Sequence, residues 1–297
     1  MSELRLRHDY RGKVRDLYNV GDDLILMVAS DRLSAFDVVM DQSIPQKGRV
    51  LTALTNYWLN EFGPSVPTAL VSCDPVVISQ HVPDFANAVD LHGRTMLVRR
   101  ATMVPLEFIV RGRLAGQAFE DYERTGTVFG MAAPAAMRMT DPFPDPIFTP
   151  STKVDEGHDI YISLAQAAEL VGAATLRAAE SLCRDLFARA STKMLEAGLV
   201  LADTKFELGV VDGELVVCDE VITPDSSRIW LASEVHSGEV PPSFDKQPFR
   251  DWLAGQPWDR TPPPPHVPDD VVALTTRRYV ACYENVTGRS LLDWYGR

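Results

Sequence analysis

The segment from Leu199 to Trp230 constrains the fold of this chain more than any other. Its Asp212-Gly213 pair stands between two runs of β-forming residues, which is the sequence signature of a tight hairpin. Before the turn, Asp203, Lys205 and Glu207 recur at every second residue, so in a strand their side chains share one face. The mostly apolar residues between them would face a core. The sequence therefore predicts a β-hairpin with one charged face.

The position of Asp219 after the turn depends on the length of the hairpin loop. A two-residue loop pairs Glu207 with Cys218, which sends Asp219 to the opposite face. A three-residue loop over 211–213, with its glycine left-handed in a bulge, pairs Glu207 with Val217 and brings Asp219 to the Glu207 face. We predict the bulged form, because two carboxylates on a rigid platform suit Mg²⁺ and substrate phosphates. For the hairpin alone, a solvated charged face is an alternative.

Composition excludes several classes of protein. The 297 residues, of which 45% are hydrophobic, allow one large or two moderate domains with a full core. A formal charge of -12 argues against nucleic acid as the main partner. No apolar run approaches the roughly 20 residues of a membrane span, and the first residues lack the apolar segment of a signal peptide. The dispersed cysteines and histidines predict reduced thiols in a cytoplasmic protein without a zinc site.

Two polar motifs in the first forty residues are candidates for ligand binding. Gly12, Lys13 and Arg15 lie in a predicted strand–turn–strand, where the backbone and two cations can approach a polyphosphate. A solvated basic strand is the alternative. Ser34 and Asp37 lie in a run of short polar residues directly after a buried strand, where enzymes often place binding groups. An ordinary Asp/Ser turn is the alternative there.

A third motif combines a buried strand with arginines. Residues 108–110 are predicted to form this strand, which delivers Arg111 and Arg113 into a turn that contains Gly112 and Gly116. Arginine forks match the paired oxygens of phosphate or carboxylate groups, and glycines let a ligand come close to the backbone. The motif therefore predicts an anion site.

The rest of the chain is predicted to be mainly scaffold. We expect helices over 51–62, 163–199 (broken at Gly172) and 269–286, strands over 67–78 and 94–100, a crossing loop over 130–150 and a stiff proline spacer over 262–265. Ser163 and Gln166 have the spacing of a capping box, and Asp269 is predicted to cap the last helix. The helix over 173–199 is expected to pack on the back of the hairpin.

Together these motifs resemble the SAICAR synthetases, the phosphoribosylaminoimidazole-succinocarboxamide synthases of purine biosynthesis. The runs that carry the resemblance are Gly12 to Asp16, Ser30 to Asp37, Pro105 to Gly116, Phe148 to Lys153, Asp203 to Gly209 and Asp219 to Arg228. They follow one another in the order of the family across residues 10–232. The run Asp-x-Lys-x-Glu-x-Gly, followed across a hairpin by Asp-Glu and Pro-Asp…Arg, is specific. The length and the SDRLSAFD run resemble the longer, yeast-like branch.

The resemblance implies an α+β fold with two lobes, antiparallel sheets packed by helices and a kinase-like ATP-binding lobe. We expect a nucleotide-binding lobe over 1–105 and a substrate- and metal-binding lobe with C-terminal helices over 106–297. The implied reactants are ATP with Mg²⁺, L-aspartate and carboxyaminoimidazole ribonucleotide, joined through an acyl phosphate to give SAICAR, ADP and phosphate. A small-molecule kinase that uses the same ATP lobe is the alternative. We expect a monomer or a small homo-oligomer.

The resemblance also implies a role for each matching residue. Those expected to contact ATP are Gly12, Lys13, Arg15, Glu107, Lys153, Glu207 and Asp219, of which Glu207 and Asp219 would also hold Mg²⁺. Those expected to contact the ribonucleotide are Ser34 and Asp37, together with Arg111 and Arg228, which would hold its phosphate. Those expected beside the reacting carboxylate are Asp203 and Lys205.

One position departs from the family pattern. After the arginine motif the family has a serine that usually touches the phosphate, whereas this chain has Gln117. A glutamine can still donate a hydrogen bond but is longer. Arg113 is also less typical, and the region around His158 matches only loosely.

Overall fold

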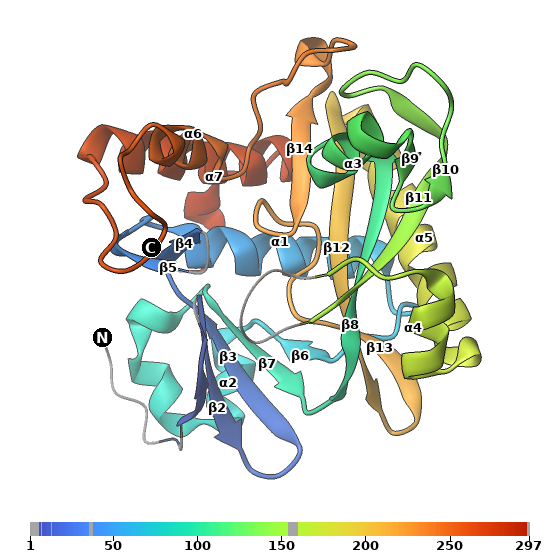
Figure 1. Cartoon of the computed structure of the whole chain (residues 1–297). Helices are drawn as coiled ribbons and strands as arrows, with labels where there is room; N and C mark the ends of the chain where they lie inside the picture. Colours follow the sequence, from blue (N-terminus) through green and yellow to red (C-terminus); the bar gives the residue numbers. More distant parts are fainter. Residues whose placement is uncertain (1–5, 7, 13, 36–37, 154–159, 296–297) are drawn as a thin grey trace.

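Two antiparallel sheets form the framework of the molecule (Figure 1). This computed structural model describes residues 6, 8–12, 14–35, 38–153 and 160–295. The first sheet has the order β1-β2-β3-β7-β6. Its strands are His8–Arg11, Arg15–Val20, Leu24–Ala29, Thr95–Arg99 and Leu70–Ser72.

The second sheet lies above the first in Figure 1 and has the order β11-β8-β12-β13, with β14 also paired to β12. Its strands are Pro142–Thr152, Thr102–Arg113, Leu199–Val211, Glu214–Cys218 and Ser227–Leu231. Two small hairpins complete the strands, namely Arg32–Ala35 with Val38–Ser43 (β4, β5) and Thr127–Val128 with Met131–Ala132 (β9, β10).

Seven α-helices of the described chain cover these sheets and join them. They are Lys47–Phe62 (α1), Pro75–His81 (α2), Gln117–Thr125 (α3), Leu164–Val171 (α4), Ala173–Glu196 (α5), Gln247–Ala254 (α6) and Asp269–Thr287 (α7). Short 3-10 turns lie at Pro83–Asn87, Val89–Leu91, Ala232–Glu234 and Leu291–Asp293. In the described part of the chain, every helix is too short or too polar to span a lipid bilayer.

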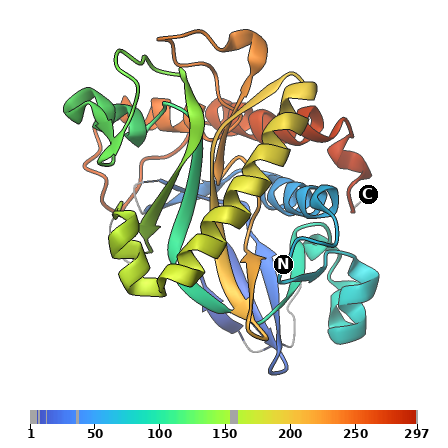
Figure 2. The same cartoon turned by 90° about the vertical axis from the view of Figure 1, so that its right-hand side faces the viewer.

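The main core lies between the second sheet and α5, which runs across the back of that sheet (Figure 2). Phe108 of β8 and Phe206 of β12 point to this side and are fully buried. Leu186 and Met194 of α5 meet them at helical spacing. Burying each such side chain stabilises the fold by about 1.5–3 kcal/mol. Alternation along the strands therefore leaves the opposite face free for charged residues.

The hairpin of β12 and β13 has a two-residue loop, so the predicted bulge is wrong. Glu207 pairs with Cys218, and only Asp212 and Gly213 lie in the loop. Both loop residues have positive φ, 53° and 82°, as a type I′ turn requires. This turn matches the twist of the strands without an extra residue, so the hairpin gains nothing from a bulge.

Proline explains two further differences from the sequence prediction. Residues 142–152 form β11 although the sequence predicts a loop there, because this strand lies at the sheet edge, where proline removes no necessary ladder bond. Residues 75–81 form α2 rather than the end of a strand. Pro75 occupies the first helical position, and Asp74 accepts a hydrogen bond from the amide of Val76 at 2.8 Å.

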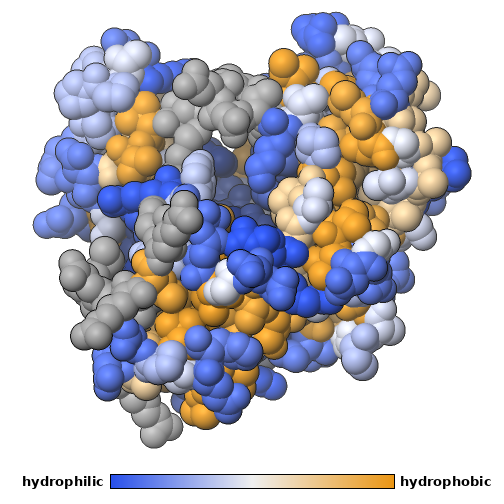
Figure 3. Space-filling model, turned by 90° about the horizontal axis from the view of Figure 1, so that it is seen from below, coloured by the Kyte–Doolittle hydropathy of each residue, from blue (hydrophilic) through white to orange (hydrophobic). Residues whose placement is uncertain are grey.

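The helix predictions are mostly confirmed. The capping box of Ser163 and Gln166 is present, and Gly172 separates α4 from α5. Helix α1 begins at residue 47, four positions before the predicted start. Asp269 lies in the first turn of α7 and does not cap it, since Pro268 occupies the cap position. Viewed from below, the molecule has a hollow with a hydrophilic interior between its two sides (Figure 3).

Candidate active site

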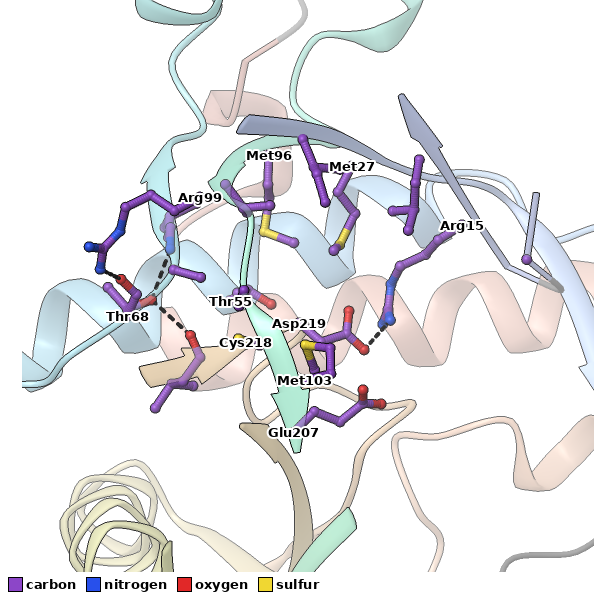
Figure 4. A pocket seen from close by; sticks show the side chains of 18 of the residues that line it. Arg15, Met27, Thr55, Thr68, Met96, Arg99, Met103, Glu207, Cys218 and Asp219 are labelled. Atoms are coloured by element: carbon purple, nitrogen blue, oxygen red, sulfur yellow. Dashed lines mark hydrogen bonds and ion pairs between the residues drawn. The ribbon is translucent and has the colours of Figure 1, made fainter. Parts of the chain in front are cut away.

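A cavity of about 500 Å³ opens between the two sheets. The first sheet contributes apolar side chains, among them Met27 of β3 and Met96 of β7. The described charged side chains that line the cavity are Arg15, Arg99, Glu107, Lys153, Lys205, Glu207 and Asp219. Figure 4 shows the side chains of Asp219 and Glu207 below those of Met27 and Met96. The cavity therefore combines an apolar slot with a charged end.

Asp219 reaches this cavity because its backbone is left-handed, with φ 58°. In a continued strand its side chain would face away from that of Glu207, which pairs with the preceding Cys218. The left-handed residue breaks this alternation, so both carboxylates line the cavity (Figure 4). Arg15 donates a hydrogen bond to Asp219 and forms an ion pair of 2.6 Å with Glu220.

Two lysines separate the carboxylates on the second sheet. Lys153 Nζ lies 2.5 Å from Glu207 Oε2. Lys205 Nζ lies 2.5 Å from Glu107 Oε1 and 3.7 Å from Glu207 Oε1. Glu107 and Glu207 are directly opposite each other on β8 and β12, which places Lys205 beside both. Positive and negative side chains therefore alternate at the charged end of the cavity, where they can bind a polyphosphate together with a cation.

Burial and these neighbours set the charge states of the two acids. Burial alone would raise the pKa of Glu207, but the attraction of Lys153 and Lys205 holds it below its ordinary value. For Asp219, burial, opposed by Arg15 and aided by the neighbouring carboxylates, raises the pKa to about 7. A cation bound beside Asp219 would favour its charged form. The two acids thus differ, since its neighbours favour the charged form of Glu207, whereas Asp219 depends more on a bound cation to stabilise its charged form.

A second cluster of charges lies farther along β12. Asp203 is buried and accepts hydrogen bonds from Arg228 Nη1 at 2.6 Å and from Arg111 Nη1 at 3.4 Å. The amide of Arg228 also donates to Asp203 Oδ1 at 3.3 Å. Arg111 Nε donates to Thr149 Oγ1 at 3.1 Å. One carboxylate therefore holds two arginines, which leaves a net positive charge for an anionic ligand.

The beginning of α3 lies against this arginine pair. Gly116 occupies the cap position with φ 53° and ψ -135°, and no side chain caps the helix. A Cβ at Gly116 would overlap Arg228 Nη2 and lie 2.6 Å from its Cζ. The absence of a side chain therefore lets the Arg228 guanidinium reach the helix start. Free amide groups at a helix start attract anions, so the helix and the arginines favour the same ligand.

The remaining predicted residues fall into three groups. Gly12 lines the cavity. Ser34 lies in β4, whose hairpin with β5 packs against α6, and it is not among the residues that line the cavity. Lys13 and Asp37 lie outside the described residues, as do His158 and Asp159.

Sequence reasoning missed three residues at these sites. Glu220 pairs with Arg15, and its position next to Asp219 could have indicated this. Tyr161 contacts Arg111, and Phe129 stacks on Tyr161. Nothing in the sequence signals either aromatic residue, because both lie in segments that carry no recognised motif.

Comparisons with known proteins find relatives over almost the whole chain. The family model for SAICAR synthetase matches residues 8–265. A phosphoribosylaminoimidazole-succinocarboxamide synthase of Saccharopolyspora erythraea is 47% identical over 290 residues, which cover 95% of this chain and 94% of the relative. A structure of SAICAR synthase from Saccharomyces cerevisiae, complexed with SAICAR, has a TM-score of 0.87 and 40% identity, with 98% of each chain covered.

A more distant structure, a SAICAR synthetase in complex with ADP, has a TM-score of 0.70 at 22% identity and covers 95% of this chain and 98% of its own. This likeness concerns the fold alone. The family match over most of the chain and the identity to full-length relatives are sufficient for assignment. The chain belongs to the SAICAR synthetase family.

Proposed function

We propose that this chain is an ATP-dependent ligase that joins L-aspartate to carboxyaminoimidazole ribonucleotide and so forms SAICAR, ADP and phosphate in purine biosynthesis. The observation that carries the proposal is the pairing of a nucleotide-sized cavity with a separate arginine cluster on one sheet face. The SAICAR complex of the yeast relative supports the same substrate class. Four buried, unpaired cysteines suit the reducing cytoplasm where we expect the enzyme to work.

ATP would bind in the cavity between the sheets. Its base would lie among the apolar side chains of the first sheet, and its phosphates would reach Arg15, Lys153 and Lys205. A relative of the same fold was solved with ADP, which supports a nucleotide in this family. The kinase-like character of this lobe remains part of the proposal.

The carboxylates of this cavity fit a Mg²⁺ ion. Glu207 offers a charged oxygen pair, and Asp219 Oδ1 is buried without a hydrogen-bond partner in the described structure. Two carboxylates and phosphate oxygens are the ligand set that Mg²⁺ commonly accepts. Mg²⁺ held there would neutralise charge on the phosphates during transfer. Arg15 would then be released from Asp219 to contact phosphate as well.

The ribonucleotide phosphate would bind at the start of α3, between Arg111 and Arg228. Asp203 holds both arginines, so its predicted catalytic role would consist partly in positioning them. Lys205 is two residues along the same strand face and points to the cavity. The reacting carboxylate would therefore lie near Lys205, between the phosphate site and ATP.

The proposed reaction has two steps. A carboxylate oxygen of the ribonucleotide attacks the γ-phosphorus of ATP, and ADP leaves. The amine of aspartate then attacks the acyl carbon, phosphate leaves with the bonding electrons, and the amine loses a proton. The detour replaces a poor leaving group by a good one. The protonated Lys205, whose pKa is raised by Glu107 and Glu207 although burial opposes this, would stabilise the transferred phosphoryl group.

A reconstituted assay tests the function. Purified protein with Mg²⁺-ATP, aspartate and the ribonucleotide should release ADP only when all are present, with SAICAR formed in equal amount. Glu207→Gln should lower kcat/KM for ATP by a factor on the order of 100 (about 2.7 kcal/mol). The surface variant Glu196→Gln serves as a matched control and should have no effect. ADP release without aspartate would indicate a kinase instead.

A further inference from the structure

Gln117, at which the chain departs from its family, is hydrogen-bonded to a side chain that no motif contains. The Tyr161 hydroxyl donates to Gln117 Oε1 at 2.8 Å. Arg111 Nη2 donates to the same hydroxyl at 2.7 Å. Tyr161 thus joins the first residue of α3 to the arginine cluster. Both of its partners border the place where we propose that the substrate phosphate binds.

An aromatic stack fixes the Tyr161 ring. The rings of Phe129 and Tyr161 lie 3.8 Å apart at an angle of 21°. The Cζ atom of Arg111 lies 5.2 Å from the centre of each ring. A guanidinium near aromatic faces is attracted by them, and the rings also exclude water. The stack therefore holds both the hydroxyl and the Arg111 guanidinium at the site.

The backbone of Phe129 is unusual in a way that points to function. Phe129 and Gly130 form the two-residue loop between β9 and β10, with φ of 50° and 79°. The first position of such a type I′ turn normally takes Asn, Asp or Gly, and a bulky residue there is an outlier. The Phe129 amide donates to Asp121 Oδ2 at 2.6 Å, which supports this conformation. Strained residues of this kind concentrate at functional sites.

We propose that Tyr161 binds the phosphate of the ribonucleotide and supplies the hydroxyl group that Gln117 lacks. The inference rests on the proposed function of the arginine cluster. On binding, the hydroxyl turns its proton from Gln117 Oε1 to a phosphate oxygen. The freed amide of Gln117 can then present its NH₂ group to the same anion. Arg111, Arg228 and the start of α3 complete the site, with Phe129 as the positioning residue behind Tyr161.

The alternative is that Tyr161 only fills space beside the arginines. A structural role would be seen as lower thermal stability, with KM for all substrates changed together or not at all. A phosphate-binding role concerns one substrate alone. The Tyr161→Phe variant separates the two, because it keeps the stacked ring and removes only the hydroxyl.

Calorimetric titration with the ribonucleotide gives the direct readout and needs no turnover. Tyr161→Phe should weaken binding roughly tenfold or more, as expected for a lost hydrogen bond to a charged group. KM for the ribonucleotide should rise by a similar factor, while KM for ATP and aspartate and the melting temperature stay unchanged. Tyr122→Phe is the matched control, since its hydroxyl donates to the Pro134 carbonyl at 2.7 Å and belongs to the scaffold.

A rescue variant strengthens the test. In the Tyr161→Phe background, Gln117→Ser restores the family residue and should recover at least part of the lost affinity for the ribonucleotide. Unchanged ribonucleotide binding in Tyr161→Phe would overturn the inference. If the wild-type protein still makes SAICAR in that case, the proposed function stands. Absence of ligase activity in the wild-type protein would instead refute the proposed function. The titration would still show whether the Tyr161 hydroxyl contributes to ribonucleotide binding.

Discussion

Position 116 requires glycine, because of both its backbone conformation and the space beside it. Its φ of 53° with ψ of -135° is open almost only to glycine, and the Arg228 guanidinium lies where a side chain would begin. The same residue ends the arginine motif and starts α3. Because Gly116 has no Cβ, the Arg228 guanidinium can lie directly against the start of α3.

Gly116→Ala should raise KM for the ribonucleotide by roughly tenfold or more, because the displaced Arg228 loses a charge-assisted contact. Its KM for ATP should stay within about twofold, since the nucleotide cavity is separate.

Gly126→Ala is the control for backbone strain alone, because Gly126 has φ 71° and nothing lies within 4 Å of an added Cβ. It should lower stability by about 1 kcal/mol without changing either KM. Equal kinetic effects of the two alanines would contradict the assigned role of Gly116.

At the residue scale, sequence reasoning found side chains but not all of their partners. Glu207 and Lys205 could be placed on one face because a strand alternates with period two, which is a local property. The contact of Tyr161 with Gln117 spans 44 positions and depends on how the start of α3 packs against the segment around Tyr161. No local pattern encodes such a contact, so Tyr161 could not be predicted.

At the scale of elements, the loop of residues 219–226 between β13 and β14 has a strained backbone and is held by α1. Asp219 and Ile222 both have positive φ, 58° and 49°, although neither is glycine. The amide of Val221 donates to Thr55 Oγ1 of α1 at 3.2 Å. Asp225 forms an ion pair of 2.6 Å with the fully buried Lys47 at the start of α1. Helix α1 thus holds the loop that carries Asp219 and leads to Arg228 in β14.

Removing one partner of this buried pair should be costly. Asp225→Asn leaves the Lys47 charge without compensation and should lower the free energy of unfolding by about 3–5 kcal/mol. The double variant with Lys47→Met should lose less, because the fully buried Lys47 charge is removed together with its partner, whereas Lys246, 3.9 Å from Asp225, loses the same partner in both variants. Denaturant melts of the single and double variants measure both effects, and equal losses would contradict the coupling.

The pair also sets a pH dependence of stability. Burial would raise the pKa of Asp225, but Lys47 and Lys246, with a hydrogen bond from Tyr279, hold it well below its ordinary value. Because the folded state favours the carboxylate, the contribution is complete above about pH 4 and is lost as the pH falls below that. Between roughly pH 5 and 3, the free energy of unfolding plotted against pH should fall more steeply for the wild-type protein than for the double variant. Parallel curves would argue against this account.

Elements were predictable where their signals are local. The capping box of Ser163 and the break at Gly172 gave α4 and α5 because caps and glycines act within one turn. Strand β11 was missed because its prolines are tolerated only at an edge, and strand order is a property of the whole sheet. The hairpin was found, but its turn type decides register by one residue, which the charge pattern could not settle.

At the scale of the molecule, the two sheets meet beside the cavity through backbone hydrogen bonds and a buried apolar cluster. Val217 exchanges backbone hydrogen bonds of 2.9 Å with Pro67 and Ala69, and residues 100–101 connect β7 to β8. The cavity is lined from both sheets. A ligand bound there would therefore add contacts between the two sheets.

Mg²⁺-ADP should stabilise the whole protein. At a ligand concentration of about 100 times Kd the gain is roughly 2.7 kcal/mol, which corresponds to a rise in Tm of about 4 °C for a chain of this size. Differential scanning calorimetry of the wild-type protein measures the shift, and Glu207→Gln should reduce it. A shift of equal size in that variant would place the nucleotide elsewhere.

The left-handed backbone of Asp219 narrows the amino acids that evolution or a designer can use there. Among residues with a side chain, Asp and Asn enter this conformation most readily, and of the two only Asp carries the charge. Glutamate would keep the negative charge but would be strained in the left-handed backbone conformation. Asparagine would adopt that conformation but would lose the charge. At position 219 the backbone conformation and the need for a negative charge together therefore favour aspartate over every other amino acid.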